Sequence, residues 1–179
     1  MEDNLVGVAD VIEAIKTEIR AAQEVVIGDP KLELAGVDLE IKSLITKSAK
    51  GEVKAEIPAV SPTGSFGGNI KEDQLQKLHL SLEPPEPELL KESSTDLRKL
   101  NIASAIVALR RELQKGLSGK PRLLPKKLDI EVSFGVQRSA GGGAGINLVF
   151  LKIGGSGEYI SECAHKVILH FVAPRLPRP

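Results

Sequence analysis

Aromatic residues and cysteine are both scarce in this chain of 179 residues. Aromatic residues make up 3% of the sequence and tryptophan is absent, so stacking platforms for bases or sugars are nearly lacking. The single cysteine, Cys163, cannot form a disulfide within the chain and suits a reducing compartment. A core must therefore be built from leucine, isoleucine, valine and alanine.

An excess of one charge and long apolar runs are lacking as well. The 24 basic and 24 acidic side chains balance, so no overall field attracts nucleic acid or an anionic membrane. No apolar run reaches the length of about 18 residues that a membrane span needs. The acidic residues 1–4 also lack the basic and apolar regions of a signal peptide. We expect a cytoplasmic protein that binds neither nucleic acid nor a membrane.

What the chain does contain is an internal repeat. Four apolar patterns each occur twice, in the same order. The paired starting residues are Val8 and Ile102 (offset 94), Val37 and Leu128 (91), Val53 and Ile146 (93), and Leu78 and Val167 (89). The offset changes between the patterns, where loops tolerate insertion. The chain therefore contains two similar units of roughly 80 residues each.

Both units have the same predicted elements. Apolar residues spaced three and four apart predict a helix over 5–26 and another over 102–113. Alternating apolar residues predict three strands per unit, over 37–46, 53–57 and 75–82, and over 128–136, 146–150 and 167–171. The predicted fold class is α+β, with two tandem α-β-β-β units. We expect each unit to be an antiparallel sheet packed on one long helix, and the units to be related by a pseudo-twofold axis.

Composition predicts the boundaries of the two units. The first repeat spans 1–83, a linker rich in proline and charge spans 84–99, the second repeat spans 100–174, and a proline-rich tail spans 175–179. Leu89, Leu90 and Leu97 could extend the second helix backward, with Ser94 as its cap, so the start of that helix stays open.

The apolar stripes of the two helices are the candidate interface between the units. Alanines flank both stripes and would allow a close helix–helix approach. The candidate interface residues are Val8, Ile12, Ile15, Ile19, Ile102, Ile106, Leu109 and Leu113. Two units on one chain would then reproduce the homodimer that a single-copy relative forms, and a homo-oligomer of the whole chain is a further possibility.

Glycine-rich stretches at 141–145 and 154–157 are the clearest candidates for a phosphate-binding loop. Such a loop needs a following helix N-terminus and usually a Lys-Ser or Lys-Thr pair. Strand patterns follow both stretches instead, so we interpret them as turns. Residues 65–69 are interpreted as a connection.

Cys163 and His165 would share one face of a strand and are the only candidates for a nucleophile–base pair or for metal ligands. A zinc site needs about four ligands, and a catalytic thiol needs a base and an orienting partner. The first unit has Gln74 and Gln76 at the equivalent positions. We interpret the pair as part of a half-buried strand and expect no catalytic, cofactor-binding or metal-binding residues.

Several charged residues, most of them on the helices, are the remaining candidates for functional residues. Glu18 and Glu112 occupy equivalent helix positions, which is common for exposed glutamate. The alternative is a shared structural role, such as pairing with a basic side chain from a sheet. The basic pairs 110–111 and 126–127 have acidic neighbours and no interleaved aromatics, so we interpret them as solvated faces.

Three segments of the chain resemble trypsin-co-occurring domain 2. They are the opening Val6–Ile15, the acidic and apolar strand Val37–Ile41, and the closing Ala164–Leu169 followed by Pro174. The resemblance covers both units. The first unit departs from it by carrying Gln76-Lys77 in place of a His-Lys or His-Arg pair, after a longer loop. The resemblance implies a small bacterial domain fused to, or encoded beside, trypsin-like peptidases and other effectors, with no catalytic residues of its own.

Taken with that resemblance, the lack of a catalytic set predicts a non-enzymatic protein-interaction or adaptor module without a cofactor. Its partner would be an effector such as a trypsin-like peptidase in a bacterial signalling or defence system. The alternative is a small-ligand sensor with a cavity between helix and sheet. A third possibility, hydrolase activity, would depend on Cys163 and His165. An enclosed pocket with converging polar groups would favour the sensor, and a solid aliphatic core would exclude it.

Overall fold

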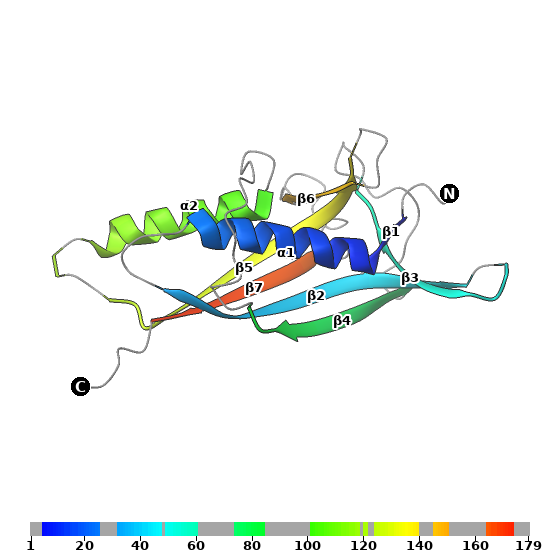
Figure 1. The fold of residues 1–179 in the computed structure, drawn as a ribbon, viewed down its shortest axis with the longest axis horizontal. Helices are drawn as coiled ribbons and strands as arrows, with labels where there is room; N and C mark the ends of the chain where they lie inside the picture. Colours follow the sequence, from blue (N-terminus) through cyan, green and yellow to red (C-terminus); the bar gives the residue numbers. More distant parts are fainter. Residues whose placement is uncertain are drawn as a thin grey trace.

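Two helices lie on one face of a single antiparallel sheet in the computed structural model (Figure 1). The structure describes residues 5–25, 32–47, 49–60, 74–84, 101–118, 120–121, 124–139, 145–150 and 164–173. The elements are β1 (Leu5–Gly7), α1 (Val8–Val25), β2 (Glu33–Lys47), β3 (Val53–Pro58), β4 (Leu75–Leu82), α2 (Asn101–Leu117), β5 (Lys127–Arg138), β6 (Ile146–Phe150) and β7 (His165–Val172). The α+β class is therefore confirmed.

Both helices form because their apolar residues recur at helical spacing and bury one side against the sheet. The buried apolar residues of α1 are Val11, Ile15, Ile19, Ala21 and Ala22, and those of α2 are Ile102, Ala103, Ile106 and Val107. The first helix begins later than the sequence predicts, because Leu5–Gly7 pairs with β3 as the short strand β1. No helix among the described residues is long and apolar enough to cross a lipid bilayer.

The strand pairings confirm the repeat residue by residue. In the first unit Val37 of β2 lies opposite Leu82 of β4, and in the second unit Leu128 of β5 lies opposite Phe171 of β7. These pairs differ by the sequence offsets of 91 and 89 residues (128 − 37 and 171 − 82). Likewise, Leu44 of β2 lies opposite Glu56 of β3, and Gly135 of β5 lies opposite Val149 of β6. These two pairs are related by offsets of 91 and 93 (135 − 44 and 149 − 56). Each unit therefore has the same internal strand register.

The prediction of two separate sheets is wrong, because the units share one. β2 pairs not only with β4 but also with β7, from Glu33 opposite Val172 to Glu40 opposite Lys166. Sheet edges expose unpaired amide and carbonyl groups, and joining one edge of each unit satisfies both sets. The β2–β7 pairing is thus the junction between the units.

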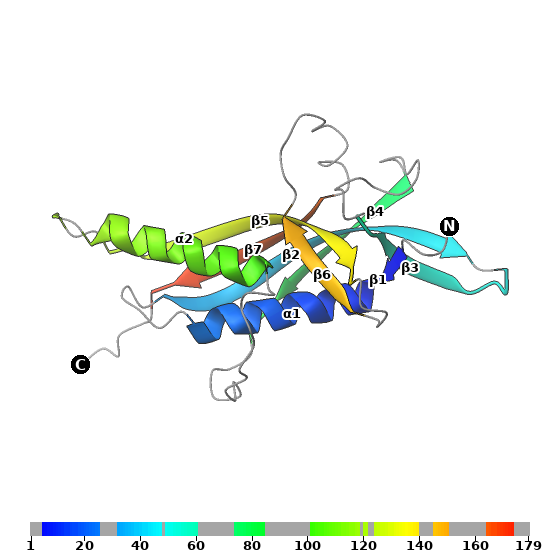
Figure 2. The same cartoon turned by 90° about the horizontal axis from the view of Figure 1, so that it is seen from above.

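The predicted pseudo-twofold relation is also wrong. The central strands follow the order β4-β2-β7-β5, so each unit contributes its last strand and then its first strand in the same direction across the sheet. A twofold axis would place β2 beside β5, or β4 beside β7. The two helices accordingly point the same way along the sheet (Figures 1 and 2). The second unit is therefore a translated copy of the first.

Several sequence predictions fall outside the described residues. These concern Cys163, the glycines at 141–144 and 154–157, the connection at 65–69, the linker 85–99, the backward extension of the second helix, and the tail 175–179.

Candidate functional site

A row of hydrogen-bonded polar side chains crosses the sheet face that the helices leave uncovered. Alternation along β2 turns Val37 and Leu39 toward the helices and Asp38 away from them. His170 of β7 lies between two carboxylates, with Nε2 at 2.8 Å from Asp38 Oδ2 and Nδ1 at 2.7 Å from Asp129 Oδ1. The Ser81 hydroxyl of β4 donates to Asp38 Oδ1 at 2.6 Å. We call Ser81, Asp38, His170 and Asp129 the outer polar row; it links four strands.

The charges of the outer polar row stabilise one another. The pKa of His170 is raised, first by its hydrogen bond to Asp129 and then by that to Asp38. The pKa of Asp129 is lowered, mainly by the bond from His170. The pKa of Asp38 is lowered, mainly by the Ser81 hydroxyl. Once protonated, both ring nitrogens of His170 donate protons, so the ring offers no lone pair to activate a nucleophile. The Ser81 hydroxyl bonds to a carboxylate rather than to the imidazole, so the row lacks a nucleophile–base pair.

One ion pair between β7 and β5 and one within β5 flank the outer polar row. Lys166 Nζ lies 3.0 Å from Glu131 Oε1, and Lys127 Nζ lies 3.0 Å from Asp129 Oδ2. Exposed pairs of this kind contribute little stability each, but they give the outer face alternating charges. Within the described residues, no group of three or more histidine, cysteine or acidic side chains could hold a metal ion.

Glu18 is the buried acidic residue that joins the two helices. Its side chain is 3% exposed, and Oε2 accepts a hydrogen bond of 2.9 Å from the Ala103 amide. The amides of Asn101 and Ile102 also bond to it. These are the first amides of α2, which have no partner within their own helix, and a carboxylate also suits the positive end of the helix dipole. Glu18 therefore caps α2 from the side of α1.

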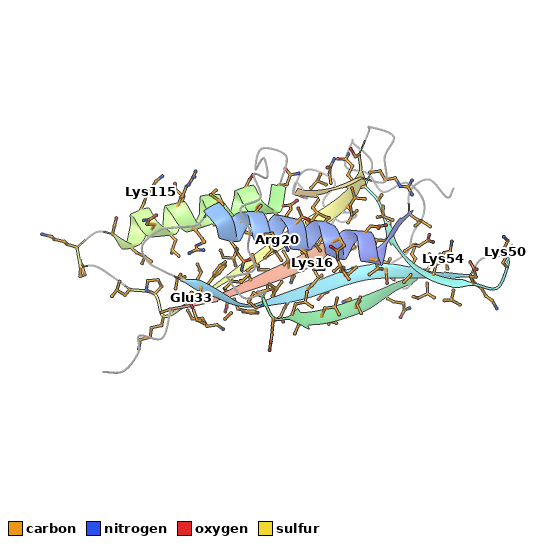
Figure 3. The ribbon with its side chains drawn as sticks, viewed as in Figure 1. Lys16, Arg20, Glu33, Lys50, Lys54 and Lys115 are labelled. Atoms are coloured by element: carbon orange, nitrogen blue, oxygen red, sulfur yellow. The ribbon has the colours of Figure 1, made fainter. Side chains whose placement is uncertain are left out.

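The electrostatics of Glu18 reflect two opposing effects. Burial raises the pKa of the Glu18 carboxyl, and the three backbone hydrogen bonds lower it by less, so the net pKa is above its ordinary value. The equivalent Glu112 is exposed and pairs with Lys115, which Figure 3 labels on α2. The interpretation of Glu18 as an exposed glutamate is thus wrong, and so is the alternative that it pairs with a basic side chain from a sheet. Equivalent positions take different roles because, among the described helices, the N-terminus of α2 lies beside Glu18 and neither N-terminus lies beside Glu112.

His165 is buried beside the ring of Phe134, with the ring centroids 5.4 Å apart. Its Nδ1 accepts a hydrogen bond of 3.1 Å from the backbone amide of Lys42. This amide lies between the end of the β2–β7 pairing at Glu40 and the start of the β2–β3 pairing at Leu44, so the imidazole replaces a strand partner. Because its Nδ1 already accepts a hydrogen bond from the Lys42 amide, His165 has a structural role and is not available as a base.

We predict that His165 makes the fold sensitive to acid. Burial, with a smaller contribution from the charge of Lys42, lowers the pKa of His165 to about 4. In the unfolded chain the imidazole of His165 is protonated near its ordinary pKa of 6.5. The free energy of unfolding therefore falls as the pH drops from 6.5 toward 4. The loss should be about 2 kcal/mol at about pH 5. Urea unfolding should show that lowering the pH from about 7 to about 5 costs the wild type about 2 kcal/mol more than it costs His165→Asn; an equal pH dependence in both proteins would contradict this role.

Between the helices and the sheet, the described residues line a small cavity of about 10 Å³, room for about one water molecule. Its lining is apolar except for Gln23 and consists of Ile19, Ala22, Gln23, Leu34, Ile106, Leu169 and Phe171. Arg110 lies beside it, with its guanidinium 4.8 Å from the centre of the Phe171 ring and Nη2 donating to the Leu32 carbonyl at 3.3 Å. Partial burial lowers the pKa of Arg110, so its assignment to a solvated face is wrong.

The candidate helix–helix residues occupy three environments. The two helices pack side by side (Figure 2). Ile15, Ile19, Ile102 and Ile106 are buried, Val8, Ile12 and Leu113 are half-buried, and Leu109 is 51% exposed. The part of the α2 stripe beyond Ile106 thus extends past the well-packed region.

Comparison with known protein families identifies the family of this chain. The family model of trypsin-co-occurring domain 2 matches residues 6–84 and, a second time, residues 100–173. The chain belongs to the trypsin-co-occurring domain 2 family. The sequence resemblance is thereby confirmed in both units. No curated protein and no solved structure matches the chain.

The outer polar row and the Glu18 cap are site features that the sequence analysis missed. One signal for the row was present: Asp38 and Asp129 are equivalent residues at the offset of 91 (129 − 38), and both take outward positions on their strands. Nothing comparable marked His170, because Ser81 stands at its equivalent position in the first unit.

Proposed function

We propose that this tandem trypsin-co-occurring domain protein is a non-enzymatic adaptor. It would recruit or regulate a trypsin-like peptidase in a bacterial signalling or defence system. The observation that carries this proposal is the match of both halves to a domain defined by its co-occurrence with trypsin-like peptidases.

The described side chains support a binding role over a catalytic one. The Ser81 hydroxyl bonds to Asp38, and His165 is buried with its Nδ1 bonded to the Lys42 amide. Neither arrangement activates a nucleophile. The helix–sheet cavity lined by described residues does not support the sensor alternative, because it measures about 10 Å³ and ligand pockets measure about 300–1,000 Å³.

A direct binding measurement tests the proposal. The purified full chain is titrated against the trypsin-like peptidase encoded nearest to its gene, with the catalytic serine of that peptidase replaced by alanine. We expect saturable binding with a dissociation constant of about 1–10 μM or tighter, and no binding to an unrelated pancreatic trypsin.

Two results would contradict the adaptor role. One is the lack of saturation at about 100 μM peptidase, a concentration that would detect even weak association. The other is hydrolysis of a peptide substrate by the chain alone, at a rate that Cys163→Ala abolishes.

A further inference from the structure

The junction between the two units consists of two unlike sheet edges. On β2 the edge runs through Gly36, Asp38 and Glu40, which lie opposite His170, Ile168 and Lys166 of β7, respectively. Because the second unit is a translated copy, each of these edges has an equivalent elsewhere in the molecule. The equivalent of the β2 edge is on β5, and the equivalent of the β7 edge is on β4.

Both equivalent edges lack a strand partner within the described part of the chain. β6 pairs with β5 only from Phe134 onward, which leaves the outer edge over Lys127–Ser133. β4 pairs with β2 alone, and in Figure 1 it borders the sheet. Neither strand contains a proline, one of the residues with which proteins protect exposed edges.

The backbone groups on these edges point outward. The Lys126 carbonyl accepts a hydrogen bond from the Ala173 amide, on the β7 side of the strand. Alternation along β5 then directs the amides and carbonyls of Lys127, Asp129 and Glu131 to the opposite, outer side. On β4, the same reasoning from the equivalent strand β7 directs those of Lys77, His79 and Ser81 outward.

We propose that the chain associates head to tail with a second copy of itself, by pairing the outer edge of β5 with the outer edge of β4. β5 of one copy would take β4 of the next as β2 takes β7 within the chain, with the same antiparallel direction. The register follows from the junction by the offsets of 91 and 89 residues. It places Lys127, Asp129 and Glu131 opposite Ser81, His79 and Lys77 of the second copy.

The side chains at these positions suit that register. Glu131 would lie opposite Lys77 of the second copy, as Glu40 lies opposite Lys166 in the register of the internal junction. Glu131 already pairs with Lys166 of its own chain at 3.0 Å, and Lys77 would add a second positive charge beside it, which is stabilising across a strand pair. On the helix side, Leu128 and Ile130 would meet Leu80 and Leu78 of the second copy. Leu78 is 36% exposed in the single chain, so the pairing would remove apolar surface from water.

The helices also have equivalent residues in the two units. Glu112 stands where Glu18 stands in the first unit, and the translation directs it toward the first turn of α1 in the second copy. That turn already contains Asp10, where α2 has Ser104. Because Asp10 adds negative charge there, a cap of α1 by Glu112 would be weaker than the cap of α2 by Glu18. The strand edges would therefore provide most of the attraction. A contact between two different surfaces either closes into a ring or continues as an open chain, and both forms satisfy the proposal.

Sedimentation of the full chain over about 1–500 μM tests the association, a range that resolves weak to moderate affinities. We expect the mass to rise with concentration from the 19.1 kDa of a single chain. Lys77→Glu and Glu131→Lys should each raise the dissociation constant about tenfold or more, because each places like charges opposite one another. Lys50→Glu, at the far hairpin labelled in Figure 3, is the matched control and should leave the dissociation constant unchanged.

Mixing the two charge variants distinguishes head-to-tail pairing from other contacts. In an alternating assembly every β5–β4 contact again has opposite charges, so an equimolar mixture of Lys77→Glu and Glu131→Lys should regain the wild-type association. His79→Pro removes an outward amide from β4 and should also weaken association. A wild-type protein of 19.1 kDa at every concentration, single variants that associate unchanged, or a mixture that stays dissociated would each overturn the proposal.

Discussion

Residues 1–84 produced without the second unit should not form a folded monomer. In the full chain the edge of β2 from Glu33 to Glu40 pairs with β7, and α1 packs against α2. A unit of roughly 80 residues buries only about 60–65% of its surface on folding, so losing both contacts leaves it too little stability. Circular dichroism and urea titration at about 10 μM, a concentration that limits weak self-association, should show no cooperative transition for the isolated unit.

Adding the second unit in trans provides the control for this experiment. Residues 100–174 supply β7 and α2, so an equimolar mixture of the two fragments should regain a cooperative transition. An isolated first unit that unfolds cooperatively as a monomer would show that the shared sheet is not needed for stability, which would contradict the account.

Glu18→Ala should lower the free energy of unfolding by about 3 kcal/mol. The substitution removes the carboxylate that stabilises the first amides of α2 and leaves the buried Ala103 amide without its acceptor. Glu112→Ala is the matched control, because Glu112 occupies the equivalent helix position and is exposed. Its effect should stay within about 0.5 kcal/mol. Urea unfolding at about pH 7 measures both, and equal effects of the two substitutions would contradict the capping role.

The pH dependence of the Glu18 variants follows from the raised pKa of this carboxyl. A raised folded-state pKa means that the folded chain holds the proton more tightly than the unfolded chain does. The stabilising contribution of Glu18 is therefore complete below its ordinary pKa of 4.5 and declines as the pH rises through the raised value. Glu18→Gln, which mimics the protonated form, should lack this decline.

The sequence predicts the internal structure of each unit well because strand register is recorded in local patterns. The alternation that begins at Val37 and at Leu128 sets which side chains face the helices, and the offsets hold when Leu82 and Phe171 pair with them. Shifting either strand by one residue would turn its apolar side chains to water. The predicted strands therefore match the structure closely.

The relation between the units could not be predicted in the same way. A repeat shows which residues are equivalent, but not which sheet edges join. A pairing of β2 with β7 and a twofold pairing of like edges would bury equivalent apolar faces, so the apolar pattern is compatible with both. The translation depends on contacts such as Asp38 with His170, which are 132 residues apart in the chain.

The candidate sites depend on distant partners for the same reason. Glu18 reaches an amide 85 residues away, and His165 reaches one 123 residues away. In the sequence Glu18 has the pattern of an ordinary surface glutamate on a helix. Its role is set by the start of α2, whose position follows from how the two units join.

The β2–β7 junction is the central claim, and nuclear Overhauser effects between backbone protons test it most directly. The amide of Lys42 points toward the β7 side of β2, so Val37 and Leu169, which lie opposite each other, form a pair without mutual hydrogen bonds. The Cα atoms of such a pair are about 4.5 Å apart, which brings their Hα protons close together. A strong Hα–Hα cross-peak between Val37 and Leu169 is expected. Its absence, with cross-peaks that join β2 to β5 or β4 to β7 instead, would contradict the translated arrangement.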